Sequence, residues 1–166
     1  MALDADIELL ERVPALSLLG PEALRILAIS AQAHEIRGGD TLFKEGDPAD
    51  CGFVVASGAF TFQRERDGRE PVVVRRGALL GETALIVGTA WGGSATAIEA
   101  STVLRIPRTV FLRVLEGVPE GAVRLRRYIA ERLAISIDEI DALRPRFETE
   151  DDKNNEYEGS GDRRPR

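Results

Sequence analysis

The amino-acid sequence predicts an α+β domain: a mainly-β roll, which is a jelly-roll-like barrel, with helices before and after it. Between residues 34 and 106, short apolar strands alternate with glycine-bearing turns at the spacing of a small all-β barrel or sandwich. On both sides of this region the apolar residues recur at helical spacing instead. A chain of 166 residues has room for one compact domain with its own core, and we expect that domain over residues 1–147.

The segment before the roll, residues 3–37, is expected to contain the N-terminal helices. Apolar residues from Ile7 to Val13 follow helical spacing, and Pro14 breaks that first helix. A second helix should begin at Pro21, because proline suits the first turn of a helix.

The roll itself, residues 34–106, contains five stretches with the apolar character of strands, separated by turn signals such as Gly46-Asp47 and Asp67-Gly68. The expected strands are Thr41–Phe43, Phe53–Val55, Ala59–Phe62, Val72–Val74 and Thr102–Ile106.

The segment after the roll, residues 107–147, is expected to form a short helix and then a long one that begins at Pro119. Apolar residues of the long helix lie near heptad spacing, and they are Ile129, Leu133, Ile140 and Leu143. This stripe either packs on the chain's own barrel or pairs with a second copy in a homodimer, and the sequence leaves both open. Beyond it, residues 148–166 are charged and poor in apolar groups, so we expect a disordered tail.

The composition favours a cytoplasmic protein without membrane or nucleic-acid partners. A formal net charge of −6 and an isoelectric point near 5.0 oppose electrostatic capture of nucleic acid or of an anionic bilayer. Two early acids, Asp4 and Asp6, do not fit a secretory signal, and no apolar run is long enough to span a bilayer. The single cysteine, Cys51, and the single histidine, His34, are expected to be structural.

Two glycine-punctuated stretches carry a family resemblance. The first is residues 43–50, Phe-Lys-Glu-Gly-Asp-Pro-Ala-Asp, followed by the apolar strand at 53–55. The second is residues 80–96, which open with Leu-Gly-Glu-Thr-Ala-Leu and close with Gly-Gly-Ser-Ala-Thr. In this order and at this separation they resemble the cyclic nucleotide-binding domain, and the resemblance extends from about Leu9 to Leu143.

The resemblance implies that the second stretch is a phosphate-binding cassette, which consists of a Gly-Glu turn, one short helix and a strand. Glycine lets the backbone approach a ligand closely, and the free amides at the start of a short helix attract an anion. Glu82 inherits the family role of binding the ribose 2′-hydroxyl, although a helix-capping carboxylate is the other interpretation. The candidate ligand-binding residues are Gly81, Glu82, Thr83, Ala84, Gly93, Ser94, Ala95 and Thr96.

Gly93 occupies the position at which the family carries the arginine that pairs with the cyclic phosphate. No lysine or arginine lies between Gly77 and Leu104. Loss of a charge-assisted partner of about 3 kcal/mol lowers affinity more than about a hundredfold. We therefore expect no cofactor, and weak or no binding of cyclic AMP or cyclic GMP. Trp91, in the loop before Gly93, either stacks on a base or fills the cavity of an absent nucleotide.

These observations predict a non-enzymatic regulatory or interaction module that binds an unidentified protein partner. The alternative is a genuine sensor of a cyclic nucleotide or another small molecule, in which a substitute cation such as Arg75, Arg76 or Arg105 reaches the cassette. A transcription-regulator fragment is less favoured, since such proteins place a helix-turn-helix after the long helix, and an acidic tail follows Phe147 here. An enzyme is not expected, because the sequence has no metal-ligand cluster, nucleophile motif or Walker-type loop.

Overall fold

The computed structural model describes residues 2–132, and its first compact unit ends at Leu125. From Arg126 onward the chain belongs to a second unit, of which residues 126–132 are described and helical. The predicted domain end at residue 147 and the predicted tail therefore lie outside the described residues. So do Leu133, Ile140 and Leu143 of the predicted dimer stripe.

Three helices precede the sheets: α1 (Ala2–Glu11), α2 (Pro14–Ser17) and α3 (Pro21–Ser30). Pro14 ends the first helix as expected and also opens α2, because the first position of a helix does not need the amide hydrogen that proline lacks. Pro21 opens α3 in the same way. No helix in the described part of the chain is long and apolar enough to cross a membrane.

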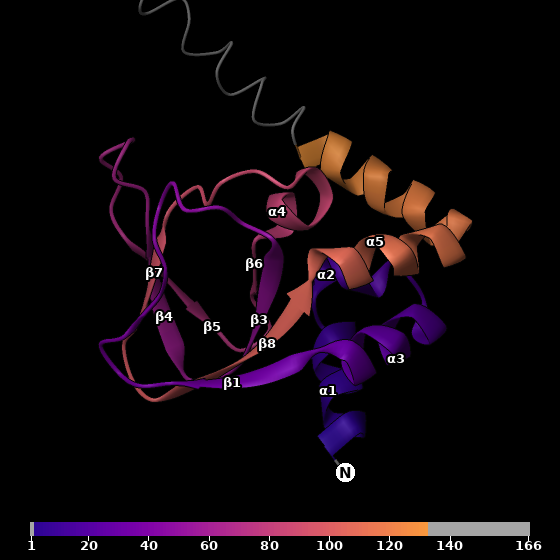
Figure 1. Ribbon diagram of the computed structural model, residues 1–166, viewed down its shortest axis with the longest axis horizontal. Helices are drawn as coiled ribbons and strands as arrows, with labels where there is room; N and C mark the ends of the chain where they lie inside the picture. The colour runs from indigo at the N-terminus through magenta and orange to yellow at the C-terminus, as the bar shows by residue number, and fades with distance from the viewer. Residues whose placement is uncertain (1, 133–166) are drawn as a thin grey trace, which may run out of the picture. The chain divides into compact units, whose positions relative to one another are not determined.

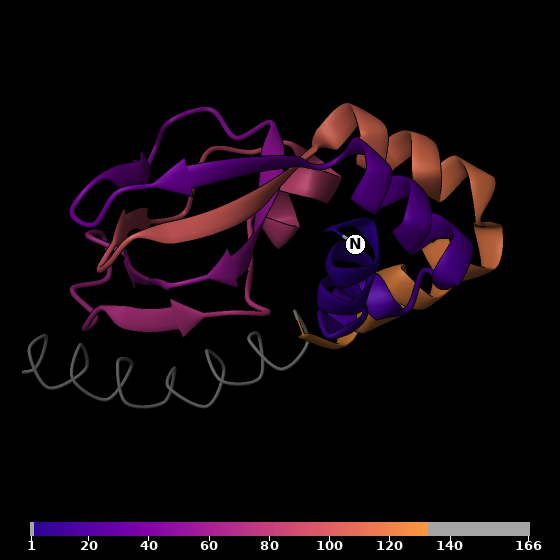
Figure 2. The ribbon, with the colours of Figure 1, turned by 90° about the horizontal axis from the view of Figure 1, so that it is seen from below.

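Eight antiparallel strands form two four-stranded sheets that enclose a common core (Figures 1 and 2). The strand order is β1-β8-β3-β6 in one sheet and β2-β7-β4-β5 in the other. The strands are β1 (Gln32–Ile36), β2 (Thr41–Phe43), β3 (Cys51–Ser57), β4 (Ala59–Gln63), β5 (Val72–Arg75), β6 (Leu79–Leu80), β7 (Ser94–Ala97) and β8 (Ser101–Pro107). The predicted class, a β-roll flanked by helices, is confirmed.

The five expected strands are observed as β2, β3, β4, β5 and β8. The helical segment expected over residues 3–37 is wrong at its end, because α3 stops at Ser30 and β1 begins at Gln32. Four of the five residues of β1 are exposed, so the strand has no apolar alternation to reveal it. Its pairing with β8, from Gln32 opposite Arg105 to Ile36 opposite Ser101, defines it instead.

The core of the roll is made of aromatic and small apolar side chains from both sheets. Phe43 on β2 and Phe53 on β3 stack with their ring centroids 6.1 Å apart, and Phe60 on β4 is fully buried. Ala95 and Ala97 on β7 are also buried, and their small side chains leave the volume to the rings. The interior is therefore filled by side chains of the protein itself.

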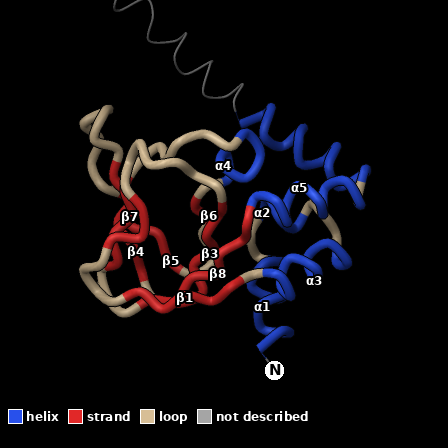
Figure 3. Tube along the Cα trace, viewed as in Figure 1, coloured by secondary structure: helices blue, strands red, loops and turns tan. Residues whose placement is uncertain are grey.

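Two helices position the candidate cassette. The short α4 (Glu82–Val87) lies between β6 and β7 and packs on β3, where an added Cβ at Gly52 would lie 2.8 Å from Leu85 Cδ1. The longer α5 (Arg108–Gly117) follows β8 and packs against α3 and α4, so the helices of this unit gather beside the strands (Figure 3). A further helix begins at Pro119, as expected.

Candidate functional site

Gly81 turns the chain into α4 at the start of the candidate cassette. Its φ of +90° lies in the left-handed region, which glycine adopts at little cost. A side chain would also collide, since an added Cβ would lie 2.7 Å from Trp91 Cζ3 and 2.9 Å from the carbonyl oxygen of Cys51. The backbone angle and the packing therefore both require glycine here.

The next three candidates take different positions on the first turn of α4. Glu82 is half-buried, Thr83 is exposed and Ala84 is buried. The amide of Leu85 donates to the carbonyl of Gly81 at 3.0 Å, which closes the first turn of the helix. Thr83 is thus the candidate of this group whose side chain is most open to solvent.

Trp91 is part of the core of the roll. Its ring stacks on Phe43 with centroids 3.7 Å apart and an interplanar angle of 8°, and its centroid lies 5.8 Å from that of Phe53. The residue is 8% exposed. Its backbone is held on both sides, because the Trp91 amide donates to the Asp47 carbonyl and its own carbonyl accepts from the Gly46 amide, each at 2.9 Å. The indole consequently occupies the space in front of Gly81.

Gly93 is buried directly before β7, and its surroundings leave no volume for a side chain. An added Cβ would lie 2.6 Å from Cζ of Phe62 and 2.8 Å from the backbone oxygen of Gln63. The half-buried ring packs against the core, and the oxygen belongs to the backbone of β4. Packing against the neighbouring strand is thus a physical reason for glycine at this position.

The last three candidates lie on β7, where the Ser94 hydroxyl and the Thr96 carbonyl accept hydrogen bonds within the roll. The hydroxyl of Ser94 accepts a hydrogen bond from the amide of Glu45 at 2.9 Å. Ala95 is completely buried, and the carbonyl of Thr96 accepts from the hydroxyl of Thr61 at 3.4 Å. Ser94 therefore anchors the loop after β2 in this structure.

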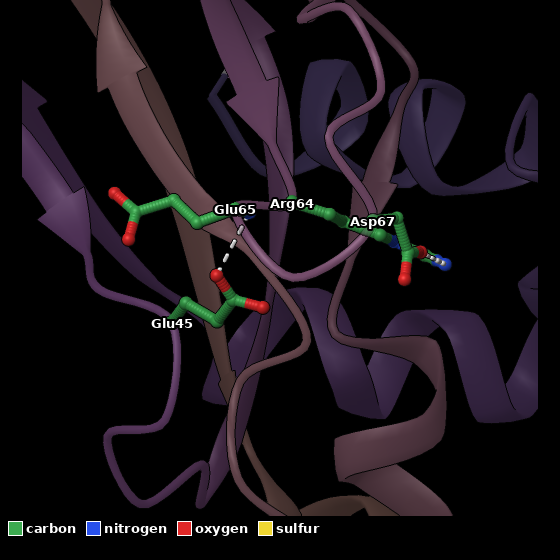
Figure 4. A network of polar contacts seen from close by, with 4 residues as sticks. All are labelled: Glu45, Arg64, Glu65 and Asp67. Atoms are coloured by element: carbon green, nitrogen blue, oxygen red, sulfur yellow. Dashed lines mark hydrogen bonds and ion pairs between the residues drawn. The ribbon is translucent and has the colours of Figure 1, made fainter.

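The loop after β2 makes a second contact, with the loop that follows β4. The carboxylate of Glu45 accepts a hydrogen bond from the amide of Glu65 at 2.9 Å, and Figure 4 shows it reaching the backbone of the neighbouring loop. Within the loop that contains Glu65, Arg64 forms a 3.9 Å ion pair with Asp67. The Glu45–Glu65 hydrogen bond thus ties two loops together at the edge of an open cleft, and the ion pair lies within one of them.

The open cleft has a volume of about 670 Å³ and lies beside Trp91. Its lining residues are Glu45, Gly46, Glu65, Arg66, Thr89, Ala90, Trp91 and Gly92. Within the described part of the chain, none of the eight cassette candidates is among them. Residues 89–92 of the second stretch line the cleft, so the accessible hollow borders the candidate cassette, although its eight candidate ligand-binding residues do not line it.

Two of the arginines near the cassette are already engaged elsewhere. Arg108 donates to the carbonyl of Ile86 at 3.2 Å, at the carboxyl end of α4, where a cation complements the helix dipole. Arg105 forms a 3.6 Å ion pair with Asp50. Arg105 was one of the three predicted substitute cations, and its guanidinium is thus held by a carboxylate.

Cys51 and His34 occupy very different environments. Cys51 is buried at the start of β3, and burial raises the pKa of its thiol, although nearby Arg105 opposes this shift. His34 lies exposed on β1, opposite Val103 of β8. Among the residues described, no cluster of histidine, cysteine and carboxylate side chains could hold a metal ion.

The side chains that pack around Gly93 and Trp91 are not among the predicted site residues. Phe62 and Gln63 enclose Gly93, and Phe43 stacks on Trp91. Phe43 and Phe62 are visible in the sequence as apolar strand residues, but their contact with the cassette depends on the pairing of β4 and β2 with β7. Only the sheet topology brings them together.

The family model for the cyclic nucleotide-binding domain matches residues 33–117. The chain belongs to this family. A solved structure of a cyclic nucleotide-binding-like protein from Brucella abortus is 40% identical, with a TM-score of 0.59, and the match covers 67% of this chain and 97% of that one.

Curated relatives within the family match over this one domain. An uncharacterized NTE family protein of Mycobacterium tuberculosis is 29% identical over 82% of this chain, and the match covers 23% of that protein. The cAMP-dependent protein kinase regulatory subunit of Aspergillus fumigatus is 35% identical over 74% of this chain and 29% of that subunit. The chain thus spans less than a third of the length of either relative.

Proposed function

We propose that this chain is a non-enzymatic regulatory module that keeps the cyclic nucleotide-binding fold without a working cyclic nucleotide site. The observation that carries the proposal is the enclosure of Gly93, where an added Cβ would lie 2.6 Å from Phe62. An arginine cannot project from this position unless β4 moves. The site therefore lacks both the phosphate-pairing charge and the volume to hold one.

The position of Trp91 supports the same proposal. Its ring lies against Gly81 and stacks on Phe43, so the space that the cassette glycine would offer to a ligand is occupied. Displacing a buried tryptophan exposes a large apolar surface to water. The free-energy cost is several kcal/mol, on the order of the stability lost when such a side chain is truncated. A ligand at the cassette would have to offset that cost.

The module is proposed to act through a protein partner in the cytoplasm, without a cofactor. The match to a kinase regulatory subunit supports a regulatory role, because that protein's name describes control of another protein. We also propose that two copies form a homodimer through the helix that contains Ile129.

Titration with cyclic AMP and cyclic GMP tests the proposal. Calorimetry should show no saturable heat up to millimolar nucleotide, and the emission of the single tryptophan should not change, since Trp91 is adjacent to the cassette. Saturable binding in the low micromolar range with unit stoichiometry would contradict it. In that case Arg66→Ala decides whether the open cleft beside Trp91 supplies the substitute cation.

A further inference from the structure

Strand β5 is a short edge of the second sheet, with three valines and a terminal arginine. It pairs with β4 on one side and ends the strand order β2-β7-β4-β5, of which Figure 1 labels β7, β4 and β5. Val72 is 59% exposed and Val73 is 49% exposed, so two adjacent aliphatic side chains face water. Proteins usually shield such an edge with charge, a bulge or a covering segment, because its free amides and carbonyls pair readily with another strand.

The hydrogen-bond alternation along β4 shows which groups of β5 face outward. The carbonyl of Ala59 accepts from Ile98 and its amide donates to Ser101, so Ala59 turns both groups away from β5. In an antiparallel ladder the next residue turns the other way, so Phe60 bonds with its partner Val74. Val73 lies between two such pairs, and its amide and carbonyl therefore point to the free edge.

Two copies of β5 can pair with each other antiparallel about Val73. In this register Val73 faces Val73 of the second copy, and Val72 faces Val74. The next outward pair is Pro71 and Arg75. Pro71 has no amide hydrogen, and the carbonyl of Arg75 is already taken by the amide of Ala78 at 3.0 Å. The nitrogen of Pro71, which cannot donate, thus falls opposite the occupied carbonyl of Arg75. The amide of Arg75 falls opposite the free carbonyl of Pro71.

The charges flanking β5 favour the same register. With Val73 at the centre, Glu70, two residues before the strand, comes to the same end as Arg76, which begins the turn after it in the other copy, so each end of the pair brings opposite charges together. Centring on Val72 instead places Arg69 opposite Arg75. Centring on Val74 forms no charge pair at all. A register whose two-fold axis lies between two residues is excluded. It would place a residue whose backbone groups face the free edge opposite a residue whose backbone groups face β4.

We propose that β5 is the interface through which two copies of this chain associate, with a two-fold axis at Val73. The β2-β7-β4-β5 sheets of the two copies then join edge to edge into one continuous sheet. The interface is self-complementary, as two-fold symmetry requires. It does not depend on whether the cassette binds a nucleotide.

Charge reversal tests the interface in the full chain. Sedimentation equilibrium should show a monomer–dimer equilibrium for the natural sequence. Glu70→Arg and Arg76→Glu should each weaken the dimer about tenfold, because each places like charges opposite one another twice. The double variant should restore it, and Arg69→Glu, which changes a neighbouring charge, should leave it unchanged. A protein that stays monomeric at every concentration, or a double variant no stronger than the single ones, overturns the proposal.

Cysteine cross-linking tests the register independently of any other dimer contact. Opposite residues in a bonded antiparallel pair have Cα atoms about 5.5 Å apart, within the range of a disulfide, so Val73→Cys should cross-link under mild oxidation. Val72→Cys is the matched control, because its twin lies roughly 8 Å away in this register. The natural Cys51 is buried and should not compete. Equal cross-linking at the two positions, or none at Val73, contradicts the interface.

Discussion

Gly93 has room for a hydrogen atom and for nothing larger. The Phe62 ring and the Gln63 carbonyl press on it from the adjacent strand, while its neighbour Gly92 is exposed and has no atom within 4 Å of an added Cβ. Two consecutive glycines thus differ completely in their tolerance of a side chain. The substitution that the family pattern suggests, an arginine at position 93, meets the more restrictive of the two.

Gly93→Arg should lower the free energy of unfolding by about 3 kcal/mol, the upper end of what overpacking a core costs, and should not create cyclic nucleotide affinity. Gly92→Arg adds the same charge one residue earlier and should change stability by less than about 0.5 kcal/mol. Chemical denaturation and calorimetry of both variants measure this difference. A stable Gly93→Arg protein that binds cyclic AMP would show that the missing charge is the only defect of the site.

The Cys51 thiol gives a second test at this scale. Burial holds its pKa above the ordinary value, so the thiol should react slowly with a thiol-specific reagent at pH 8 in the folded protein and rapidly in denaturant. Below the pKa of the unfolded thiol both states are protonated, and the group does not affect stability. Above it the unfolded state ionises first, so stability falls with rising pH. Thermal unfolding between pH 7 and pH 10 should show this slope, and Cys51→Ala should reduce it.

At the scale of elements, α4 rests on β3 through one glycine. Gly52 is buried in β3, and an added Cβ would meet Cδ1 of Leu85 at 2.8 Å and Cγ at 3.0 Å. Leu85 is 1% exposed and is the largest fully buried side chain of the short helix. The helix therefore packs on the strand at a position where a side chain on the strand would collide with Leu85.

Substitutions at this contact should be strongly coupled. Gly52→Ala should cost about 1–3 kcal/mol through overpacking, and Leu85→Ala about 2–5 kcal/mol through the cavity it leaves. In the double variant the new methyl group enters the vacated space, so the total loss should be smaller than the sum by about 1 kcal/mol or more. A double-mutant cycle by urea denaturation measures the coupling, and simple additivity would mean that α4 and β3 are not in contact.

At the scale of the whole molecule, the chain carries a net negative charge. The net charge of −6 repels a polyanion, and the cyclic nucleotide-binding fold supplies no DNA-reading element of its own. In a gel-shift assay at about 100 mM salt, near the ionic strength that screens beyond about 10 Å, the chain should not retard double-stranded DNA. A sequence-selective shift would support the transcription-regulator hypothesis instead.

Much of the fold can be predicted from the sequence because its signals are local. The alternation of apolar strands with glycine turns predicts five of the eight observed strands, and Pro14, Pro21 and Pro119 mark helix boundaries. The motif around Gly81 and the absence of an arginine at position 93 are likewise readable from single residues in order. Strand β1 escapes prediction, since its exposed residues carry no apolar pattern.

Only the tertiary structure shows why glycine occupies position 93 and tryptophan position 91. Gly93 is confined by Phe62, and Trp91 stacks on Phe43, because strands that are distant in the chain are neighbours in a sheet. Such contacts follow from long-range pairing and close packing, which local patterns do not specify. The sequence by itself determines the family and the missing charge, and the folded chain alone shows that the space for that charge is filled.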